Sequence, residues 1–219
     1  MALNLNFSSG DNGSGIIPIV KYDARAGRIS KRDYVGGEYV TTDITKTFSA
    51  IADFENIETG WIAFTPQGPD MAVAKFGDQV PAQPSPEHKQ GVRLLMQLNS
   101  KLDGTVRELA SSAKAFLRGI DDLHSKYLEG AKQYPGLLPI IKLADTVLHT
   151  TGEGTRKSAN YIPVFEIVKW VDRPEKLVYT PKMRMASNTQ VQISAPPATG
   201  SAKFVAPVSG IADAEDDFG

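Results

Sequence analysis

The sequence predicts a mainly β fold with a single helix, and three observations carry this prediction. Short segments of alternating or β-branched residues, separated by turns rich in glycine and proline, occupy most of residues 16–109. One long amphipathic segment follows at residues 111–133, and two apolar, β-prone segments follow it within residues 138–171. With 219 residues and 41% apolar composition, the chain has room for one packed domain, which we place at residues 16–193.

The strands of the first half are expected at short intervals. Residues 16–22 and 28–34 are expected to form a hairpin around a turn at residues 23–27. Gly36 and Gly37 then interrupt the pattern. Further strand signals lie at residues 44–57, 60–65, 71–76, 91–99 and 105–109, and residues 77–91 read as a surface loop with three prolines.

The helix is predicted from the spacing of its apolar residues. Ser111 and Ser112 are suited to cap its first turn. The apolar residues recur at intervals of four, three and four, which places them on one helix face: Phe116, Ile120, Leu123 and Tyr127. Pro135 and Gly136 mark its end.

The last two strands are expected to form one long hairpin over residues 138–171, because both are rich in branched and aromatic side chains. The loop between them, residues 150–160, carries Arg156 and Lys157 and is expected to extend beyond the sheet as a positively charged finger. Pro163 cannot donate a hydrogen bond to a neighbouring strand, which predicts an edge strand or a bulge.

A helix between the third and fourth strands of a small β chain is the arrangement of the oligonucleotide-binding (OB) fold. That fold is a five-stranded Greek-key barrel, which binds through one sheet face and its loops. The sequence carries more than five strand signals, so the surplus segments are expected to form extra hairpins. A β-sandwich with an inserted helix is the alternative.

Both ends of the chain have compositions that disfavour packing. Residues 1–15 are rich in Asn, Ser and Gly, which predicts a flexible N-terminus. Residues 194–219 are rich in Pro, Ala, Ser and Gly, which predicts a disordered linker with an acidic tip: Asp213, Glu215, Asp216, Asp217 and Phe218. The sequence has no apolar run of membrane-spanning length and no secretory signal pattern, so we expect a soluble, cytoplasmic protein.

The composition argues against several kinds of enzyme site. Without cysteine the chain has no disulfide, thiolate metal site or cysteine nucleophile. Its three histidines are not at metal-ligand spacings, and it lacks a P-loop and a nucleophile elbow. Asp53 with Glu55, and Asp121 with Asp122, are more simply solvated carboxylates than acid pairs. We therefore expect no catalytic residue, no metal and no cofactor.

The formal net charge of −1 conceals an uneven distribution. Residues 21–33 hold five cations and two carboxylates, a local excess of three positive charges. This hairpin is either an edge protected by solvated charges or a basic platform flanked by Tyr22 and Tyr34. Trp61 and Phe64 lie on opposite faces of their strand, and we expect Trp61 in the core.

Cations and rings spread over β structure favour a single-stranded nucleic acid as ligand, because cations follow phosphates and each base stacked on a ring contributes about 1–3 kcal/mol. The stacking candidates are Tyr22, Tyr34, Trp61, Phe64, Tyr161 and Trp170. The phosphate-binding candidates are Arg25, Arg28, Lys31, Arg32, Lys75, Arg93, Arg107, Arg156 and Lys157. The acidic tip resembles a nucleic-acid strand in charge and is expected to compete for the same groove. A solubilising end without a partner is the alternative for the tip.

Three segments and the tail carry a resemblance to a known family. The segments IVKYDARAGR, FENIETGWIAF and YIPVFEIVKWVDRP, followed by the Pro-rich linker and DDFG, resemble bacteriophage single-stranded-DNA-binding proteins with an OB barrel. The resemblance implies a non-enzymatic protein of the host-cell cytoplasm that coats unwound DNA during replication, recombination and repair. It also implies a tail that recruits a polymerase, helicase or recombinase, and it allows a homo-oligomer.

Two other classes of function remain open. A structural or assembly protein of the virion is one, because β-rich domains with loose ends are common in virions. A nuclease that uses Asp53 and Glu55 with a divalent metal is the other.

Overall fold

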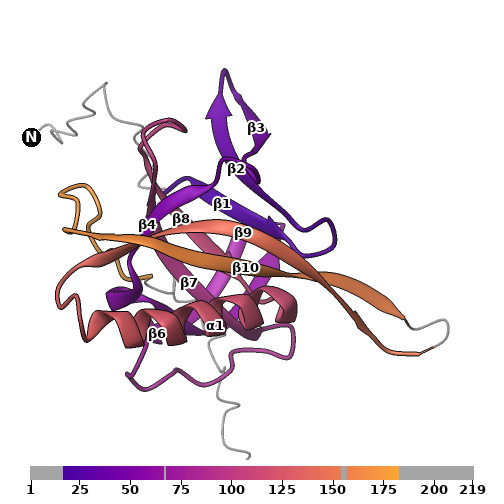
Figure 1. Ribbon diagram of the computed structural model, residues 1–219. Coiled ribbons are helices and arrows are strands. Elements are labelled where there is room, and N and C mark those ends of the chain that lie inside the picture. Colours follow the sequence, from indigo (N-terminus) through magenta and orange to yellow (C-terminus); the bar gives the residue numbers. More distant parts are fainter. Residues whose placement is uncertain (1–16, 67, 154–156, 183–219) are drawn as a thin grey trace, which may run out of the picture. The chain divides into compact units, whose positions relative to one another are not determined.

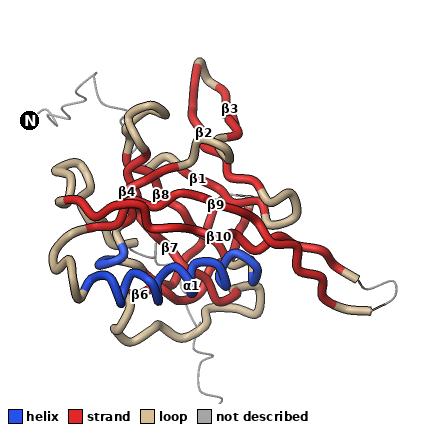
Figure 2. Tube along the Cα trace, in the orientation of Figure 1, coloured by secondary structure: helices blue, strands red, loops and turns tan. Residues whose placement is uncertain are grey.

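Ten strands, one α-helix and one 3-10 helix make up the described part of the chain (Figures 1 and 2). The computed structural model describes residues 17–66, 68–153 and 157–182, all within a unit that ends at Arg184. The elements are β1 (Ile19–Asp23), β2 (Arg28–Val35), β3 (Glu38–Asp43), β4 (Ser49–Ala52), η1 (Phe54–Asn56), β5 (Glu58–Thr65), β6 (Gly68–Lys75), β7 (Lys89–Leu98), β8 (Val106–Ser111), α1 (Lys114–Ala131), β9 (Leu138–Thr151) and β10 (Ser158–Val171).

The strands form one curled, mixed sheet in the order β10-β9-β4-β7-β8-β1-β2-β3. All pairings are antiparallel except that between β1 and β8. Strand β7 pairs along one edge with β8 and along the other first with β5 and then with β4, while β6 pairs with β5. The prediction of a mainly β chain with one α-helix is confirmed. The sheet has ten strands and the form of a half-barrel.

The amphipathic stripe of the helix is buried as predicted. Phe116, Ile120, Leu123 and Tyr127 all lie in the main core, together with side chains from β1, β2, β4, β7, β8 and the long hairpin. Two glycines bring α1 close to β10. A Cβ atom on Gly119 would lie 2.3 Å from the carbonyl oxygen of Pro163, and one on Gly130 would lie 2.3 Å from the ring of Trp170.

The long hairpin is confirmed, with β9 and β10 paired from end to end. Pro163 lies in β10, which is the last strand of the sheet, and the register shifts next to it between Val164 and Phe165. The distal half of the hairpin extends beyond the rest of the sheet (Figure 1). We call residues 146–151 and 158–162 the arm. No helix among the described residues has the length and apolar character needed to cross a bilayer.

Three local predictions differ from the structure. Strand β3 was not expected; it follows a two-residue turn in which Gly36 and Gly37 both have positive φ, at 60° and 94°. Residues 44–57 yield only the short β4 and η1. Neither Ser111 nor Ser112 caps α1, because the helix begins one residue later, after Ala113.

Candidate nucleic-acid interface

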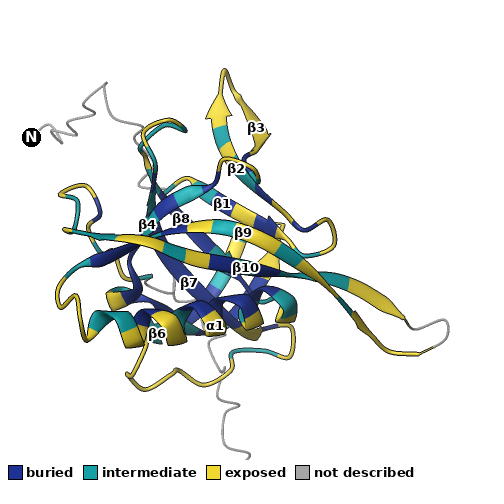
Figure 3. Cartoon of the chain, viewed as in Figure 1, coloured by how far each residue is buried: buried dark blue, intermediate teal, exposed yellow. Residues whose placement is uncertain are grey.

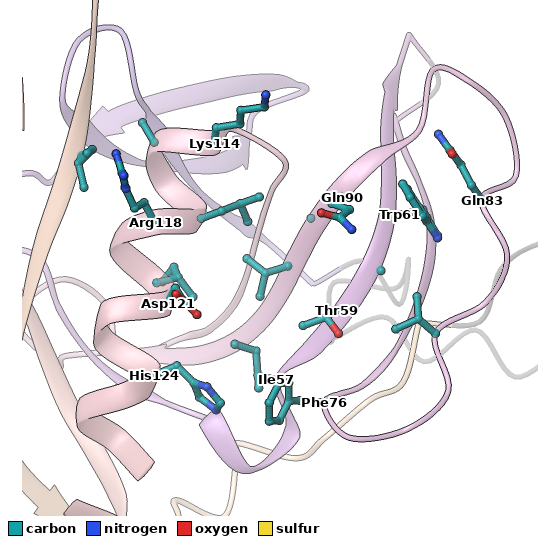
Figure 4. Close-up of a pocket in the computed structure, with 18 of the residues that line it drawn as sticks. Ile57, Thr59, Trp61, Phe76, Gln83, Gln90, Lys114, Arg118, Asp121 and His124 are labelled. Carbon is teal, nitrogen blue, oxygen red and sulfur yellow. The ribbon is translucent and has the colours of Figure 1, made fainter. Parts of the chain in front are cut away.

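A groove of about 1010 Å³ lies beside α1 (Figure 4). One wall is formed by β5, the start of β7 and the segment from Phe76 to Gln83. The opposite wall is the N-terminal part of α1, from Lys114 to His124. Residues of the arm complete the groove. Segments that are far apart in the sequence therefore meet around one space.

Aromatic rings lie on one side of the groove. Trp61 on β5 is half-buried, and its indole Nε1 donates a hydrogen bond to the carbonyl oxygen of Pro81 at 3.0 Å. This bond fixes the ring against the loop. Phe76 is 54% exposed and meets His124 edge-on, with 4.8 Å between the ring centroids. The groove thus offers two ring surfaces that water still reaches, one of them held in place.

Cations lie on the opposite wall. Lys114 and Arg118 are one helical turn apart and exposed, and the first turn of α1 carries no acidic residue. The N-terminal end of a helix adds a partial positive charge to theirs. Burial lowers the pKa of His124, against the opposing charge of Asp121, which favours the uncharged form of this imidazole. The wall therefore carries the cations of Lys114 and Arg118, the carboxylate of Asp121 and the ring of His124.

The arm forms the end of the groove and is clamped at its base. His149, Thr151, Asn160 and Ile162 line the groove. On the other side of the arm, the backbone N–H of Tyr161 donates to the carbonyl oxygen of Ala24 at 2.6 Å. The hydroxyl of Tyr22 donates to the carbonyl oxygen of Tyr161 at 2.9 Å. The position of this end of the groove is therefore set by β1 and the turn after it.

A second exposed surface lies on the β2–β3 hairpin. Tyr34 is 67% exposed and Tyr39 61% exposed, and their rings meet edge-on at 5.1 Å. The guanidinium of Arg32 lies 4.1 Å from the centre of the Tyr39 ring. Arg28 follows on the same face and forms an exposed ion pair with Asp43 at 3.4 Å. We call Arg28, Arg32, Tyr34 and Tyr39 the hairpin platform; it contains three of the predicted residues.

Arg93 and Arg107 were expected to contact phosphates, but the structure buries both. The Arg93 guanidinium is paired with the carboxylates of Glu58 and Glu108, and desolvation is outweighed by these partners, which raise the pKa of Arg93. Arg107 is paired with Asp33 and Asp103. Since their charges are already compensated inside the protein, neither arginine is offered to a ligand.

Lys31 and Tyr22 are also engaged in internal contacts. The Lys31 ammonium lies 2.7 Å from Asp103 and 3.2 Å from Asp33. Tyr22 is buried beside Phe116, and burial together with the charge of Asp23 raises its pKa to about 12. Of the two tyrosines expected to flank a basic platform, only Tyr34 therefore lies on an exposed surface.

The remaining candidates are dispersed. Trp170 is half-buried and stacked between Tyr127 and Tyr134, with centroid distances of 5.8 and 5.4 Å. The Tyr161 ring packs near Gly27. Phe64 is exposed at the end of β5. Of the cations, Arg25 is exposed in the β1–β2 turn, Lys75 donates to Asn56, and Lys157 is exposed beside the arm, whereas Arg156 and the tail from Asp213 to Phe218 lie outside the described residues.

Among the predicted binding residues in the described part of the chain, Trp61 alone lines the groove. The other residues that line it were not predicted as binding residues from the sequence. The expectation that Trp61 lies in the core is wrong in this respect, because the ring is half-buried and lines the groove. The main additions are Phe76, Lys114, Arg118 and His124. A signal for the cations was present, since Lys114 and Arg118 are four residues apart in a helical pattern and therefore share a face.

Asp53 was expected to be a solvated carboxylate, but it is buried and, together with Glu55, forms an ion pair with one arginine. Asp53 is fully buried, and Arg173 lies 2.7 Å from it and 2.9 Å from Glu55. The Asn56 amide donates to the same Asp53 carboxylate. Among the described residues there is no group of three or more histidine, aspartate or glutamate side chains arranged to hold a metal ion. These carboxylates join η1 to the segment after β10.

Comparison with models of protein families, with curated proteins and with solved structures gives no match for this chain.

Proposed function

We propose that the chain binds single-stranded DNA without sequence specificity, as a phage protein of replication, recombination or repair. The observation that carries the proposal is the groove lined by accessible rings on one wall and by Lys114 and Arg118 of α1 on the other. Single strands need these two elements together, because bases stack on rings while phosphates seek positive charge. In this proposal the half-barrel is a version of the OB fold with additional strands.

The strand lies along the groove in this proposal. Trp61 and Phe76 stack on bases, and Lys114 and Arg118 contact the phosphates that pass over the first turns of α1. Lys157 beside the arm contacts the strand as it leaves the groove. Because ring faces accept any base and cations contact only the backbone, the arrangement supports binding without base specificity.

The hairpin platform and the acidic tail complete the proposal. The platform offers two further rings and two arginines to a longer strand. The tail, residues 213–218, competes with DNA for the groove and recruits a polymerase, helicase or recombinase. Removing residues 211–219 should therefore tighten binding at low salt, whereas unchanged affinity would contradict competition by the tail and leave the groove proposal standing.

Tryptophan fluorescence tests the groove directly, because the chain has two tryptophans and only Trp61 lines it. In the W170F variant, titration with oligo-dT should quench the emission of Trp61. In the W61F variant, the emission of Trp170, which is half-buried and stacked between Tyr127 and Tyr134 outside the groove, should change little. Quenching confined to Trp170, or no quenching at all, would contradict binding in the groove.

The salt dependence of affinity tests the cationic wall. Replacing Lys114 and Arg118 by glutamine should lower the slope of log affinity against log salt by about 1.4, since each phosphate contact to a single strand contributes about 0.7. The matched control replaces Lys101 and Lys132, which are exposed elsewhere, by glutamine. Equal losses in the two double variants would mean that only net charge matters and would contradict the groove.

A further inference from the structure

Strands β10 and β3, at the two ends of the main strand order, differ in how their free edges are protected. Proteins usually protect such edges with proline, lysine, bulges or a covering element. Strand β10 contains Pro163 and two register shifts, and α1 packs against it. Strand β3 has the sequence EYVTTD, without proline or lysine, and pairs with β2 without a register shift. Within the described ranges no strand pairs with its other edge.

The unprotected edge is also exposed and partly apolar. All six residues of β3 are exposed (Figure 3). Val40, in its middle, is 46% exposed, and Val35 and the tyrosines of the platform are exposed beside it. The hairpin therefore presents four large hydrophobic side chains to water around a row of backbone groups.

Two observations show which residues of β3 form backbone hydrogen bonds with β2 and which point their backbone groups outward. Val35 and Glu38 flank a two-residue turn, and in such hairpins the flanking pair exchanges both hydrogen bonds. At the other end, the Ile44 N–H donates to the Ile29 carbonyl oxygen at 2.9 Å. Because bonded and non-bonded pairs alternate, the even-numbered residues of β3 point their backbone groups toward β2. The N–H and C=O groups of Tyr39 and Thr41 consequently point away from the sheet.

We propose that β3 pairs with β3 of a second copy of this chain, in antiparallel orientation about a two-fold axis at Val40. In this register Tyr39 and Thr41 of the two copies exchange backbone hydrogen bonds, and the two Val40 side chains meet as a non-hydrogen-bonded pair. Glu38 lies opposite Thr42, and Asp43 lies opposite Gly37, so no like charges face one another. This register therefore forms backbone hydrogen bonds between the two copies and places no like charges opposite each other.

A second copy fits this edge because the edge is complementary to itself. A two-fold axis perpendicular to the sheet requires that residues on the same face oppose one another, and the register at Val40 meets this requirement. Pairing joins two half-barrels into one continuous sheet and brings the tyrosines of two platforms near the axis. The inference does not depend on DNA binding.

A cysteine crosslink tests the register, and the cysteine-free chain provides a clean background. In the proposed dimer the Cα atoms of the two Val40 residues lie about 4.5 Å apart, within disulfide range. The full-length V40C variant should form a disulfide-linked dimer under mild oxidation. The matched control is T42C, on the same face of the same strand, where the two Cα atoms would be about 14 Å apart. Equal crosslinking of both variants would overturn the register.

The oligomeric state tests the interface independently of oxidation. Sedimentation of the full-length chain without DNA should show a monomer–dimer equilibrium. V40K places two lysines opposite each other and should weaken dimerisation by about tenfold. V35K adds the same charge to an exposed position of β2, off the pairing edge, and should change it little. A chain that stays monomeric, or a dimer indifferent to V40K in a variant with the wild-type circular dichroism spectrum, would overturn the proposal.

Discussion

At the scale of single residues, the partners of a charged side chain decide whether its charge stabilises the fold or is available to a ligand. Arg93 is 2% exposed and lies between two carboxylates, so its charge is part of the core. Lys114 and Arg118 have the same sign but are exposed and line the groove. A sequence does not separate these cases, because Glu58 lies 35 residues from Arg93 and is brought to it by β5–β7 pairing.

The burial of Arg93 leads to a prediction about stability. The R93M variant leaves Glu58 buried without its cation and leaves Glu108 with only Lys182, 3.6 Å away. Removing one partner from a buried ion pair typically costs about 3–5 kcal/mol. We expect a loss of this size in the free energy of unfolding measured with urea. R28M, which breaks the exposed pair with Asp43, is the control and should change stability little. A small effect of R93M would mean that the buried network contributes nothing.

Asp103 makes stability depend on pH. Burial alone would raise the pKa of Asp103, but hydrogen bonds from Lys31, Thr105 and Arg107 outweigh it and hold this pKa well below the ordinary range. A lowered pKa in the folded state stabilises the fold above the unfolded-state pKa of about 3.9, and the contribution is lost as pH falls toward the folded value.

We therefore expect D103N to be less stable than the wild type at pH 7, with the difference shrinking as the pH is lowered from about 5 toward 2. Urea unfolding at a series of pH values measures this difference. D172N, at an exposed position, is the control and should follow the wild type throughout. A difference between D103N and the wild type that is independent of pH would contradict the role of the carboxylate charge.

At the scale of elements, the helix and the long hairpin were predictable because each carries its own periodic pattern. The stripe from Phe116 to Tyr127 and the branched residues of β9 and β10 are local signals that the packing confirms. Strand β3 was missed because all its residues are exposed, so neither face carries an apolar pattern. The walls of the groove were missed because β5, which carries Trp61, and α1, which carries Arg118, border the same space only through the packing of elements.

The close approach of α1 to β10 predicts an unusual effect of an alanine substitution. In a helix, alanine is favoured over glycine by about 1 kcal/mol. At Gly119, however, a Cβ atom would lie 2.3 Å from the backbone oxygen of Pro163, so one element must shift. We expect G119A to lower the free energy of unfolding by roughly 1–3 kcal/mol, as overpacking does. S125A, at an exposed position of α1, is the control, and a stabilising G119A would contradict the contact.

At the scale of the whole molecule, the sequence indicates the kinds of elements but not the order of the strands. The general β class, with one helix, follows from composition and periodicity. The placement of β1 beside β8 does not, because it joins Ile19 to Glu108 and Val20 to Leu109 across most of the domain. The half-barrel depends on this pairing, since it connects β1, β2 and β3 to the other strands.

Because the parallel pairing of β1 with β8 is short, we expect parts of the domain to differ in how readily they unfold locally. Two residue pairs join β1 to β8, whereas six join β7 to β8. We expect the β1–β3 meander to detach as one cooperative lobe before global unfolding. Its amides should then share a lower protection against hydrogen exchange than those of β7. Such a lobe would expose Tyr22 and Ile29 to solvent while the helix stays docked, so that a folded protein transiently uncovers part of its own core.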